Sequence, residues 1–311
     1  MRSSSTQKEK ELQSDGDASD LMRTQATARV GIVGGTGFAD IEGLQDRRDV
    51  HIATPFGPPS DAYTLGTLHG VPLAFLPRHG RGHYIQPSDL NAHANIFGFK
   101  RLGVEFLISI SACGSLRQEL APQHILVPDQ LYDHTKRRVS TFFGDGIVAH
   151  VGFAQPFCPV LSSTLFETGQ ALGIAMHSGG TYICIEGPQF STKAESEVYR
   201  SWGMDVIGMT AVPEAKLARE AEICYATLAC VTDYDVWHET AGEVTVEMVI
   251  ENLQQNVDHA KEIVRRAITA LPDERSACQC PEALANAIIT APDSIPAAQR
   301  ATLDLIVGKY I

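Results

Sequence analysis

The sequence predicts an α/β fold, a single domain in which a central mixed, mostly parallel sheet is flanked by helices. From Arg29 onward, short apolar runs alternate with helical patterns, as expected when strands and helices alternate along a chain. A chain of 311 residues with 44% hydrophobic content can bury one large core, and no linker composition interrupts it after residue 28. One domain is therefore the economical interpretation.

Composition excludes several classes of partner. The chain carries 25 Lys and Arg residues against 37 Asp and Glu residues, a net charge of −12, which argues against nucleic acid and anionic membrane surfaces. No apolar stretch reaches the roughly 20 residues of a membrane span, and the N-terminal region lacks the apolar core of a signal peptide. We expect a cytoplasmic protein that acts on small molecules.

Three segments differ in character. Residues 1–28 are polar, contain no aromatic residue and predict a disordered tail. Residues 29–275 form the main domain. Residues 276–311 predict a C-terminal helical extension packed on that domain, with two short apolar helical patterns separated by Ala291-Pro292-Asp293.

Two helices can be placed within the main domain. Pro87-Ser88 opens a helix that turns Leu90, Ala94 and Phe97 to one face and ends at Gly103. Thr245 caps the longest predicted helix, which runs to about Leu271. Its apolar stripe, mainly a core face, comprises Val246, Val249, Ile250, Leu253, Val257, Ala260, Val264 and Ile268.

Four predicted strands each end in a polar cluster. The strands are Val30–Val33, Leu73–Leu76, Phe106–Ile110 and Val206-Ile207, and the clusters after them are Gly34-Gly35-Thr36-Gly37, Arg78-His79-Gly80, Ser111-Ala112-Cys113-Gly114 and Met209-Thr210. Ligands of open α/β sheets bind outside the carboxyl ends of the strands, so the clusters should converge. Hydroxyls, a guanidinium, an imidazole and glycine-exposed N–H groups together suit a tetrahedral oxyanion. The sequence predicts a phosphate site.

Other interpretations of these clusters remain open. The glycine loop lacks the G-x-G-x-x-G spacing of a dinucleotide fold and the lysine of Walker A, and it could be a turn that carries no ligand. Arg78 could be a solvated surface charge. His79 and His83 could bind zinc, although a loop does not offer the i, i+4 face of a helical zinc motif.

Two acids and an aromatic residue follow further strands. Asp233 and Asp235 end a strand that begins near Cys224, and their spacing of two turns both carboxyl groups to one side. They could merely cap a helix or form a turn, or one could act as a general acid if burial raises its pKa. Phe190 follows the strand Thr181–Ile185 and is either a core anchor or an exposed face for a flat ring.

The seven cysteines suggest mostly reduced, buried thiols. Cys278-Gln279-Cys280 is the exception and could be a redox pair or half of a metal site. No second Cys/His pair at zinc spacing accompanies it, so we predict no metal site. We expect these two cysteines to form a disulfide with each other or with another cysteine and to have no catalytic role.

With these residues in view, the chain closely resembles the methylthioadenosine phosphorylases, the trimeric branch of the purine nucleoside phosphorylase family. The resemblance runs from about Val30 to Leu271. It rests on Gly34-Gly35-Thr36-Gly37, Thr54-Pro55-Phe56-Gly57, Arg78-His79-Gly80, Ala112-Cys113-Gly114-Ser115, Ile185-Glu186-Gly187-Pro188, Gly208-Met209-Thr210 and Thr232-Asp233-Tyr234-Asp235. It implies the nucleoside phosphorylase fold, with residues 29–275 as the catalytic domain, and a homotrimer.

The resemblance also implies roles for single residues. The residues that match the family's phosphate site are Thr36, Arg78, His79, Ser111 and Thr210, with Ala112 on the sugar side. The residues that match its nucleoside site are Phe190, Met209, Asp233, Asp235 and, around the 5′ end, Val246, Val249, Ile250 and His150, the last from the adjacent subunit. His83, in the same loop as His79, is a further candidate for contact with substrate.

The implied reaction is phosphorolysis of 5′-methylthioadenosine to adenine and 5-methylthioribose 1-phosphate, without a metal or organic cofactor. Asp233 and Asp235 favour 6-aminopurines, because a carboxylic acid can donate to N7 and accept from the 6-amino group. The rival hypotheses are a 6-oxopurine nucleoside phosphorylase, a nucleosidase that uses water, and a non-catalytic nucleoside-binding protein.

Overall fold

The structure is a computed structural model that describes residues 27–35, 41–238 and 246–311, without the side chains of residues 246–251 and 253. Most of the predicted N-terminal tail, together with Thr36 and Thr245, therefore lies outside the described residues. Within the described ranges, no helix is both long and apolar enough to cross a membrane.

In the described part of the chain, eleven strands join in one mixed sheet. The main path runs β2-β3-β4-β1-β5-β10-β9-β7, and β11, β6 and β8 branch from β5. Strands β1, β4, β5 and β11 are parallel neighbours, as are β7, β9 and β10, while the β2–β3–β4 ribbon is antiparallel. The bounds are β1 Val30–Gly34, β2 Gln45–Val50, β3 Tyr63–Leu68, β4 Val71–Pro77, β5 Phe106–Ser115, β6 Ile125–Val127, β7 Gln130–His134, β8 Met176–Ser178, β9 Thr181–Ile185, β10 Val206–Gly208 and β11 Cys224–Asp233. The predicted fold class is confirmed.

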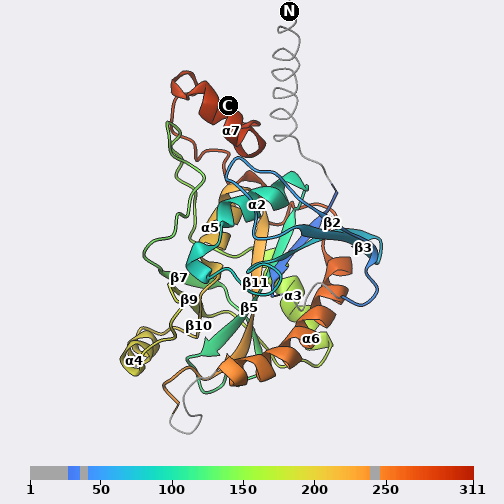
Figure 1. The fold of residues 1–311 in the computed structure, drawn as a ribbon, viewed down its shortest axis with the longest axis vertical. Helices are drawn as coiled ribbons and strands as arrows, with labels where there is room; N and C mark the ends of the chain where they lie inside the picture. Colours follow the sequence, from blue (N-terminus) through green and yellow to red (C-terminus); the bar gives the residue numbers. More distant parts are fainter. Residues whose placement is uncertain (1–26, 36–40, 239–245) are drawn as a thin grey trace, which may run out of the picture.

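Helices cover both faces of the sheet (Figure 1). The α-helices are α2 Ala92–Arg101, α3 Pro159–Ala171, α4 Lys193–Ser201, α5 Ala211–Glu220, α6 Val246–Ala270 and α7 Ala297–Val307. Strand residues alternate between two cores, so that Leu107 packs with α2 and α5 while its neighbour Ile108 packs with α3 and α6. Strands buried on both faces explain the continuous apolar runs of the sequence.

The centre of the sheet contains a gap that positions the site. Strand β11 pairs along β5 from Phe106 to Gly114, and so occupies one edge of β5. On the other edge, β1 pairs only as far as Ser109 and β10 begins only at Gly114. The β5 segment between them, residues 110–113, therefore faces an opening at the carboxyl ends of β1, β4 and β11.

The structure corrects the start of the first predicted helix. A short 3₁₀ turn, η2 (Pro87–Asp89), precedes α2, and the α-helix begins only at Ala92. The side chain of Asn91 accepts a hydrogen bond from the backbone N–H of Ala94 and so caps the helix at this point. Pro87 was predicted as the start because proline favours a first turn, but the Asn91 cap determines where the α-helix begins.

The C-terminal extension is less helical than predicted. Its first apolar pattern forms only a 3₁₀ turn, η3 (Cys280–Glu282), followed by turns, and η4 (Pro292–Ser294) precedes the one α-helix of the segment, α7. Leu284, Leu303 and Ile306 are buried in the core that also contains α2 and α5. The extension therefore packs on the domain through scattered apolar anchors rather than through two regular helices.

Candidate active site

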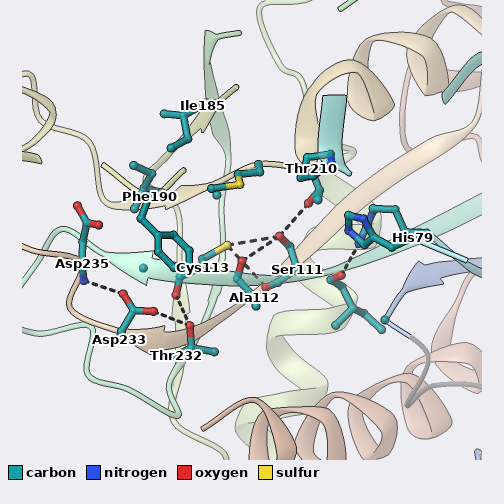
Figure 2. A pocket seen from close by; sticks show the side chains of 18 of the residues that line it. His79, Ser111, Ala112, Cys113, Ile185, Phe190, Thr210, Thr232, Asp233 and Asp235 are labelled. Carbon is teal, nitrogen blue, oxygen red and sulfur yellow. Dashed lines mark hydrogen bonds between the residues drawn. The ribbon is translucent and has the colours of Figure 1, made fainter. Parts of the chain in front are cut away.

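The gap beside β5 opens into a pocket of about 510 Å³. Most of the predicted site residues that the structure describes line this pocket, namely Arg78, His79, His83, Ser111, Ala112, Phe190, Met209, Thr210, Asp233 and Asp235. Figure 2 shows the two acids at one end and His79, Ser111 and Thr210 toward the other, with Phe190 on the side of the acids. The convergence predicted from the strand ends is confirmed.

Hydroxyl groups gather at one end of the pocket. The Ser111 Oγ lies 2.9 Å from the Thr210 Oγ1 and 3.1 Å from the Tyr182 hydroxyl, and all three side chains are at least nine-tenths buried. Gly208 permits this arrangement, because a Cβ at Gly208 would collide with the Tyr182 hydroxyl. Hydroxyls can rotate to donate, so this end of the pocket can present hydrogen bonds to an oxyanion.

His79 is held as a neutral acceptor beside these hydroxyls. Its Nδ1 lies 2.8 Å from the carbonyl oxygen of Ile85, which can only accept, so Nδ1 carries the proton and Nε2 is the free acceptor. Burial, followed by the charge of Arg78, lowers the pKa of His79 to about 4. The ring stacks on His83 with centroids 4.3 Å apart. A neutral Nε2 can accept a hydrogen bond from a sugar hydroxyl or a protonated phosphate oxygen.

Arg78 is bound mostly to the protein itself. Its Nε and Nη2 donate to the two carboxylate oxygens of Glu214 at 2.5 and 3.1 Å, and Nη2 also donates to the Ser109 Oγ at 2.7 Å. Nη1 donates to the carbonyl oxygen of Ile110 at 2.9 Å, in the stretch of β5 that has no neighbouring strand on the edge opposite β11. A guanidinium has five N–H groups, so one on Nη1 is left without a partner among the described residues.

No sequence pattern pointed to Glu214 as the partner of Arg78. Glu214 is 3% exposed and also accepts a hydrogen bond from the Tyr225 hydroxyl at 3.0 Å. Glu214 thus balances the charge of Arg78 beneath the pocket. Arg78 therefore donates its bidentate pair of hydrogen bonds to a carboxylate, and this pair is not available for a phosphate.

Asp233 is firmly oriented at the other end of the pocket. Its Oδ1 accepts the backbone N–H of Asp235 at 2.8 Å, and its Oδ2 accepts the Thr232 hydroxyl at 2.7 Å. The Oδ1 also lies close to Gly114 of β5, where any Cβ would crowd it. Burial raises the pKa of Asp233. The carboxyl group is therefore both fixed in direction and easier to protonate than an aspartate in water.

Asp235 is buried beside Asp233 with fewer partners. It is 5% exposed, and its Oδ2 has no hydrogen-bond partner among the described residues. Burial, with a contribution from the charge of Asp233, raises its pKa to about 6. The charge of one carboxyl group disfavours ionisation of the other, so Asp235 holds a proton up to about pH 6, well above the range of an aspartate in water.

Two loops complete the pocket between its ends. Phe190 is 48% exposed and lines the pocket, so it is not a core anchor. The buried side chain of Arg138 connects the loop that carries Phe190 to the loop that carries Met209. It donates hydrogen bonds to the carbonyl oxygen of Glu186, at the start of the first loop, at 2.8 Å and to that of Met209 at 2.6 Å. Nothing in the sequence near Arg138 marked it for this role.

Other predicted residues lie elsewhere or cannot be placed. Thr36 and the side chains of Val246, Val249 and Ile250 lie outside the described residues. His150 is exposed, and its backbone N–H donates to the carbonyl oxygen of Ala287 at 2.9 Å, so it does not line the pocket of its own chain. The lining also includes residues that the sequence analysis did not assign to the site, namely Pro87, Ile185, Ser191, Ile207, Gln254 and Val257.

The pocket thus has two chemically distinct ends joined by an apolar middle. Hydroxyls and a neutral imidazole acceptor at one end suit an oxyanion next to sugar hydroxyls. A protonatable carboxyl pair at the other end suits a leaving group that gains a proton. An exposed aromatic face lies on the side of the acids.

Comparison with known proteins agrees with this geometry. The family model described as the phosphorylase superfamily matches residues 29–269, from the start of the predicted domain almost to the end of α6. The chain belongs to the phosphorylase superfamily.

Its relatives within the superfamily carry a more specific name. The S-methyl-5′-thioadenosine phosphorylase of Koribacter versatilis is 55% identical over 283 residues, which cover 91% of this chain and 97% of that protein. The enzyme of the same name from Geobacter sulfurreducens is 53% identical, with 91% and 99% covered. The crystal structure of a methylthioadenosine phosphorylase from an antarctic soil metagenomic library superposes with a TM-score of 0.87 at 45% identity, covering 91% of this chain and 99% of that one. A methylthioadenosine phosphorylase from Schistosoma mansoni in complex with adenine gives a TM-score of 0.78 at 34% identity, with 86% and 99% covered.

Proposed function

We propose that this chain cleaves S-methyl-5′-thioadenosine with inorganic phosphate to give adenine and 5-methylthioribose 1-phosphate, a reaction of purine and methionine salvage. The observation that carries the proposal is that one pocket contains both an oxyanion end and a protonatable carboxyl pair. The relatives named for this activity, and solved relatives bound to adenine and to methylthioadenosine, support it.

The chemistry follows from the two ends. Breaking the N-glycosidic bond builds positive charge on the ribose and negative charge on the purine. Phosphate bound at the hydroxyl end stabilises the first charge and then attacks the anomeric carbon, while a proton from a carboxyl group at the other end neutralises the second at N7. These steps need no metal or organic cofactor.

The phosphate would bind through the hydroxyls of Ser111 and Thr210, with the remaining N–H of Arg78 beneath them. His79 would accept a hydrogen bond from a ribose hydroxyl through Nε2. Thr36, Ala112 and His83 complete the proposed contacts at this end. The ion pair of Arg78 with Glu214 implies that hydroxyls, rather than a guanidinium fork, carry most of the phosphate recognition.

The base would lie against Phe190 with its N7 and 6-amino group toward Asp233 and Asp235. A protonated carboxyl donates to N7 and accepts from the amino group, whereas a 6-oxopurine offers acceptors at both positions. Adenine nucleosides should therefore be preferred over inosine. Met209 lies under the ribose in this arrangement, and Val246, Val249 and Ile250 of α6 would approach the methylthio group.

A phosphate-dependence assay tests the reaction class. Release of free base from methylthioadenosine, adenosine and inosine is measured with phosphate and in phosphate-free buffer. We expect release only with phosphate and the highest kcat/KM for methylthioadenosine. Release without phosphate would indicate a nucleosidase, inosine as the preferred substrate a 6-oxopurine enzyme, and no release a binding protein.

We further propose that the protein is a homotrimer in which His150 serves the pocket of a neighbouring subunit. The support is that His150 is exposed and lies outside the pocket of its own chain. Light scattering measures the assembly. Co-expression of His150→Ala and Asp233→Asn chains tests the shared site. If His150 reaches a neighbouring pocket, a His150→Ala chain that retains Asp233 can receive the native His150 of an Asp233→Asn neighbour. If His150 serves its own chain, no pocket contains both native residues. We expect partial recovery of activity; mixed assemblies no more active than either variant alone would contradict the sharing.

A further inference from the structure

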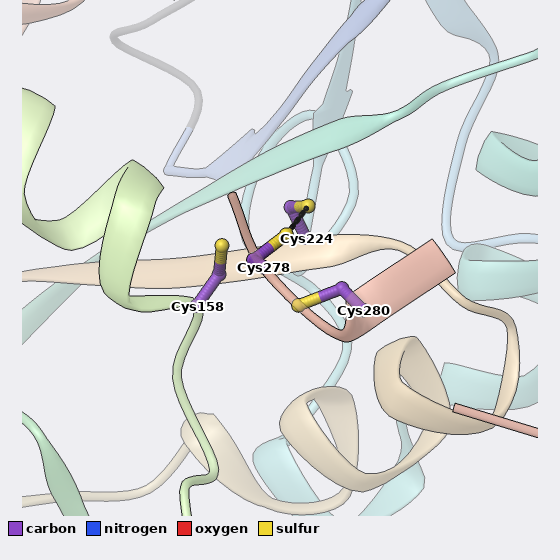
Figure 3. A group of neighbouring side chains, drawn as sticks. All are labelled: Cys158, Cys224, Cys278 and Cys280. Atoms are coloured by element: carbon purple, nitrogen blue, oxygen red, sulfur yellow. Dashed lines mark hydrogen bonds between the residues drawn. The ribbon is translucent and has the colours of Figure 1, made fainter. Parts of the chain in front are cut away.

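Four cysteines from distant parts of the sequence meet at one point. Cys158 is the N-cap residue of α3, Cys224 is the first residue of β11, and Cys278 and Cys280 flank the start of η3. Their sulfur atoms all lie within 4.8 Å of one another (Figure 3). We predicted no metal site because the sequence offers no second pair beside Cys278 and Cys280, but the fold supplies two single cysteines, Cys158 and Cys224, instead.

The spacing of the sulfurs suits one tetrahedral ion. Zinc–thiolate bonds of about 2.3 Å place the corners of a tetrahedron about 3.8 Å apart. The Cys224 and Cys278 sulfurs are 3.5 Å apart, and no pair in the group exceeds 4.8 Å. Small side-chain rotations would bring all four to bonding distance of a common centre. A disulfide, by contrast, requires about 2.05 Å between two sulfurs, and it does not explain why four sulfurs gather around one point.

The surroundings of the four sulfurs are mainly apolar. Cys158, Cys224 and Cys280 are buried in the apolar core beneath α3 and α6. Cys278 is partly exposed and packs against the same core. Cys158 stands at the N-terminus of α3, where the helix dipole favours a negatively charged group. A bound cation would balance the thiolate charges that an apolar setting disfavours.

A route from solvent reaches the cluster. A surface cavity of about 510 Å³ is lined by Cys278 and Cys280 together with Phe153, Pro159 and Arg219. No carboxylate or imidazole belongs to the group of four sulfurs in the described part of the chain. An all-sulfur donor set selects zinc over the hard cations magnesium and calcium, which take oxygen ligands.

We propose that Cys158, Cys224, Cys278 and Cys280 bind one Zn²⁺ ion that fastens the C-terminal extension to β11 and α3. On binding, four zinc–sulfur bonds form, each thiol still protonated releases its proton to buffer, and no electron is transferred. The ion connects segments that are far apart in sequence and lies outside the pocket beside β5. Its role is structural, since four protein ligands leave no open coordination position.

The test measures metal in the full-length protein, purified with a reductant and without chelators after growth with zinc. We expect about one zinc per chain by mass spectrometry of metals, and the visible d–d bands of tetrahedral cobalt–thiolate after exchange with Co²⁺. Cys280→Ser should lose most of the zinc and the cobalt bands. The control is Cys230→Ser, a buried cysteine of the same strand as Cys224 but outside the cluster, which should retain both.

Two results on the wild-type protein would overturn the proposal, and they stand even if Cys280→Ser does not fold. One is the absence of zinc after incubation with excess Zn²⁺ under reducing conditions. The other is a thiol titration, on protein purified without a reductant and then denatured, that finds fewer than the seven thiols of the sequence, because this would show disulfides in place of a metal site. Zinc retained equally in Cys280→Ser and Cys230→Ser would place the ion elsewhere.

Discussion

The variant Asp233→Asn tests acid catalysis at the base end of the pocket, because it keeps the shape of the side chain but removes its transferable proton. In the native chain, the Asp233 carboxylate accepts the Asp235 N–H at 2.8 Å and the Thr232 hydroxyl at 2.7 Å. In the variant, the amide oxygen keeps the first bond. The amide nitrogen replaces the second oxygen, and Thr232 can turn its hydroxyl to donate to the Cys113 carbonyl, which already lies 3.3 Å away. The fold should therefore lose no more than about 1 kcal/mol.

The loss in catalysis should be much larger than the loss in stability. An amide has no transferable proton for N7, and general acid catalysis contributes about 10²–10⁴-fold, equivalent to about 2.7–5.4 kcal/mol of transition-state stabilisation. Inosine should lose far less or even gain, because the amide can donate to O6 or N7. The ratio of kcat/KM for methylthioadenosine over inosine should thus fall by orders of magnitude.

The assay is base release at saturating phosphate with both nucleosides, in Asp233→Asn and in the matched Asp235→Asn. Asp235→Asn should show the smaller fall in the ratio if Asp235 only orients and tunes its neighbour. An unmoved ratio in Asp233→Asn would refute Asp233 as the acid that reads the base. A larger fall in Asp235→Asn would transfer that role to Asp235, whose free Oδ2 and pKa of about 6 make it the direct competitor.

Three further changes test the site. Ser111→Ala should raise the phosphate KM about 10–150-fold, because a hydrogen bond to a charged group contributes roughly 1.5–3 kcal/mol, and an unchanged KM would remove Ser111 from the phosphate site. Asp235→Asn should raise the free energy of unfolding by up to about 3 kcal/mol above pH 6 and by nothing below pH 3.8. The reason is that the pKa of Asp235 is about 6 in the folded protein against an ordinary 3.8, so the native carboxylate destabilises the fold increasingly as pH rises between these values. Urea denaturation measures this gain, and a gain that does not depend on pH would contradict the reasoning. Glu214→Gln should lower the free energy of unfolding by about 3–5 kcal/mol, because it leaves the Arg78 charge buried without its counter-ion. The control Glu197→Gln changes an exposed side chain and should lower it by about 0.5 kcal/mol or less. Similar losses in both variants would show that the ion pair is not needed for stability.

The sequence alone determined where the site lies and much of its chemistry. Apolar runs mark strands buried on both faces, and the carboxyl ends of parallel strands meet at one edge of a sheet. This was enough to bring Arg78, Ser111, Thr210 and Asp233 together in one pocket. It also predicted the bounds of β9, Thr181–Ile185, and a start of β11 near Cys224, because period and turn residues are local properties of a chain.

Only the tertiary structure decided which polar groups pair with one another. Arg78 and Glu214 are 136 positions apart, and no local pattern says that a buried carboxylate will occupy that guanidinium. The opening at residues 110–113 of β5 exists because two other strands end and begin there. The four cysteine sulfurs meet because α3, β11 and the C-terminal extension pack on one core. Periodicity reports whether a side chain is buried, whereas its partner is set by contacts between segments distant in sequence.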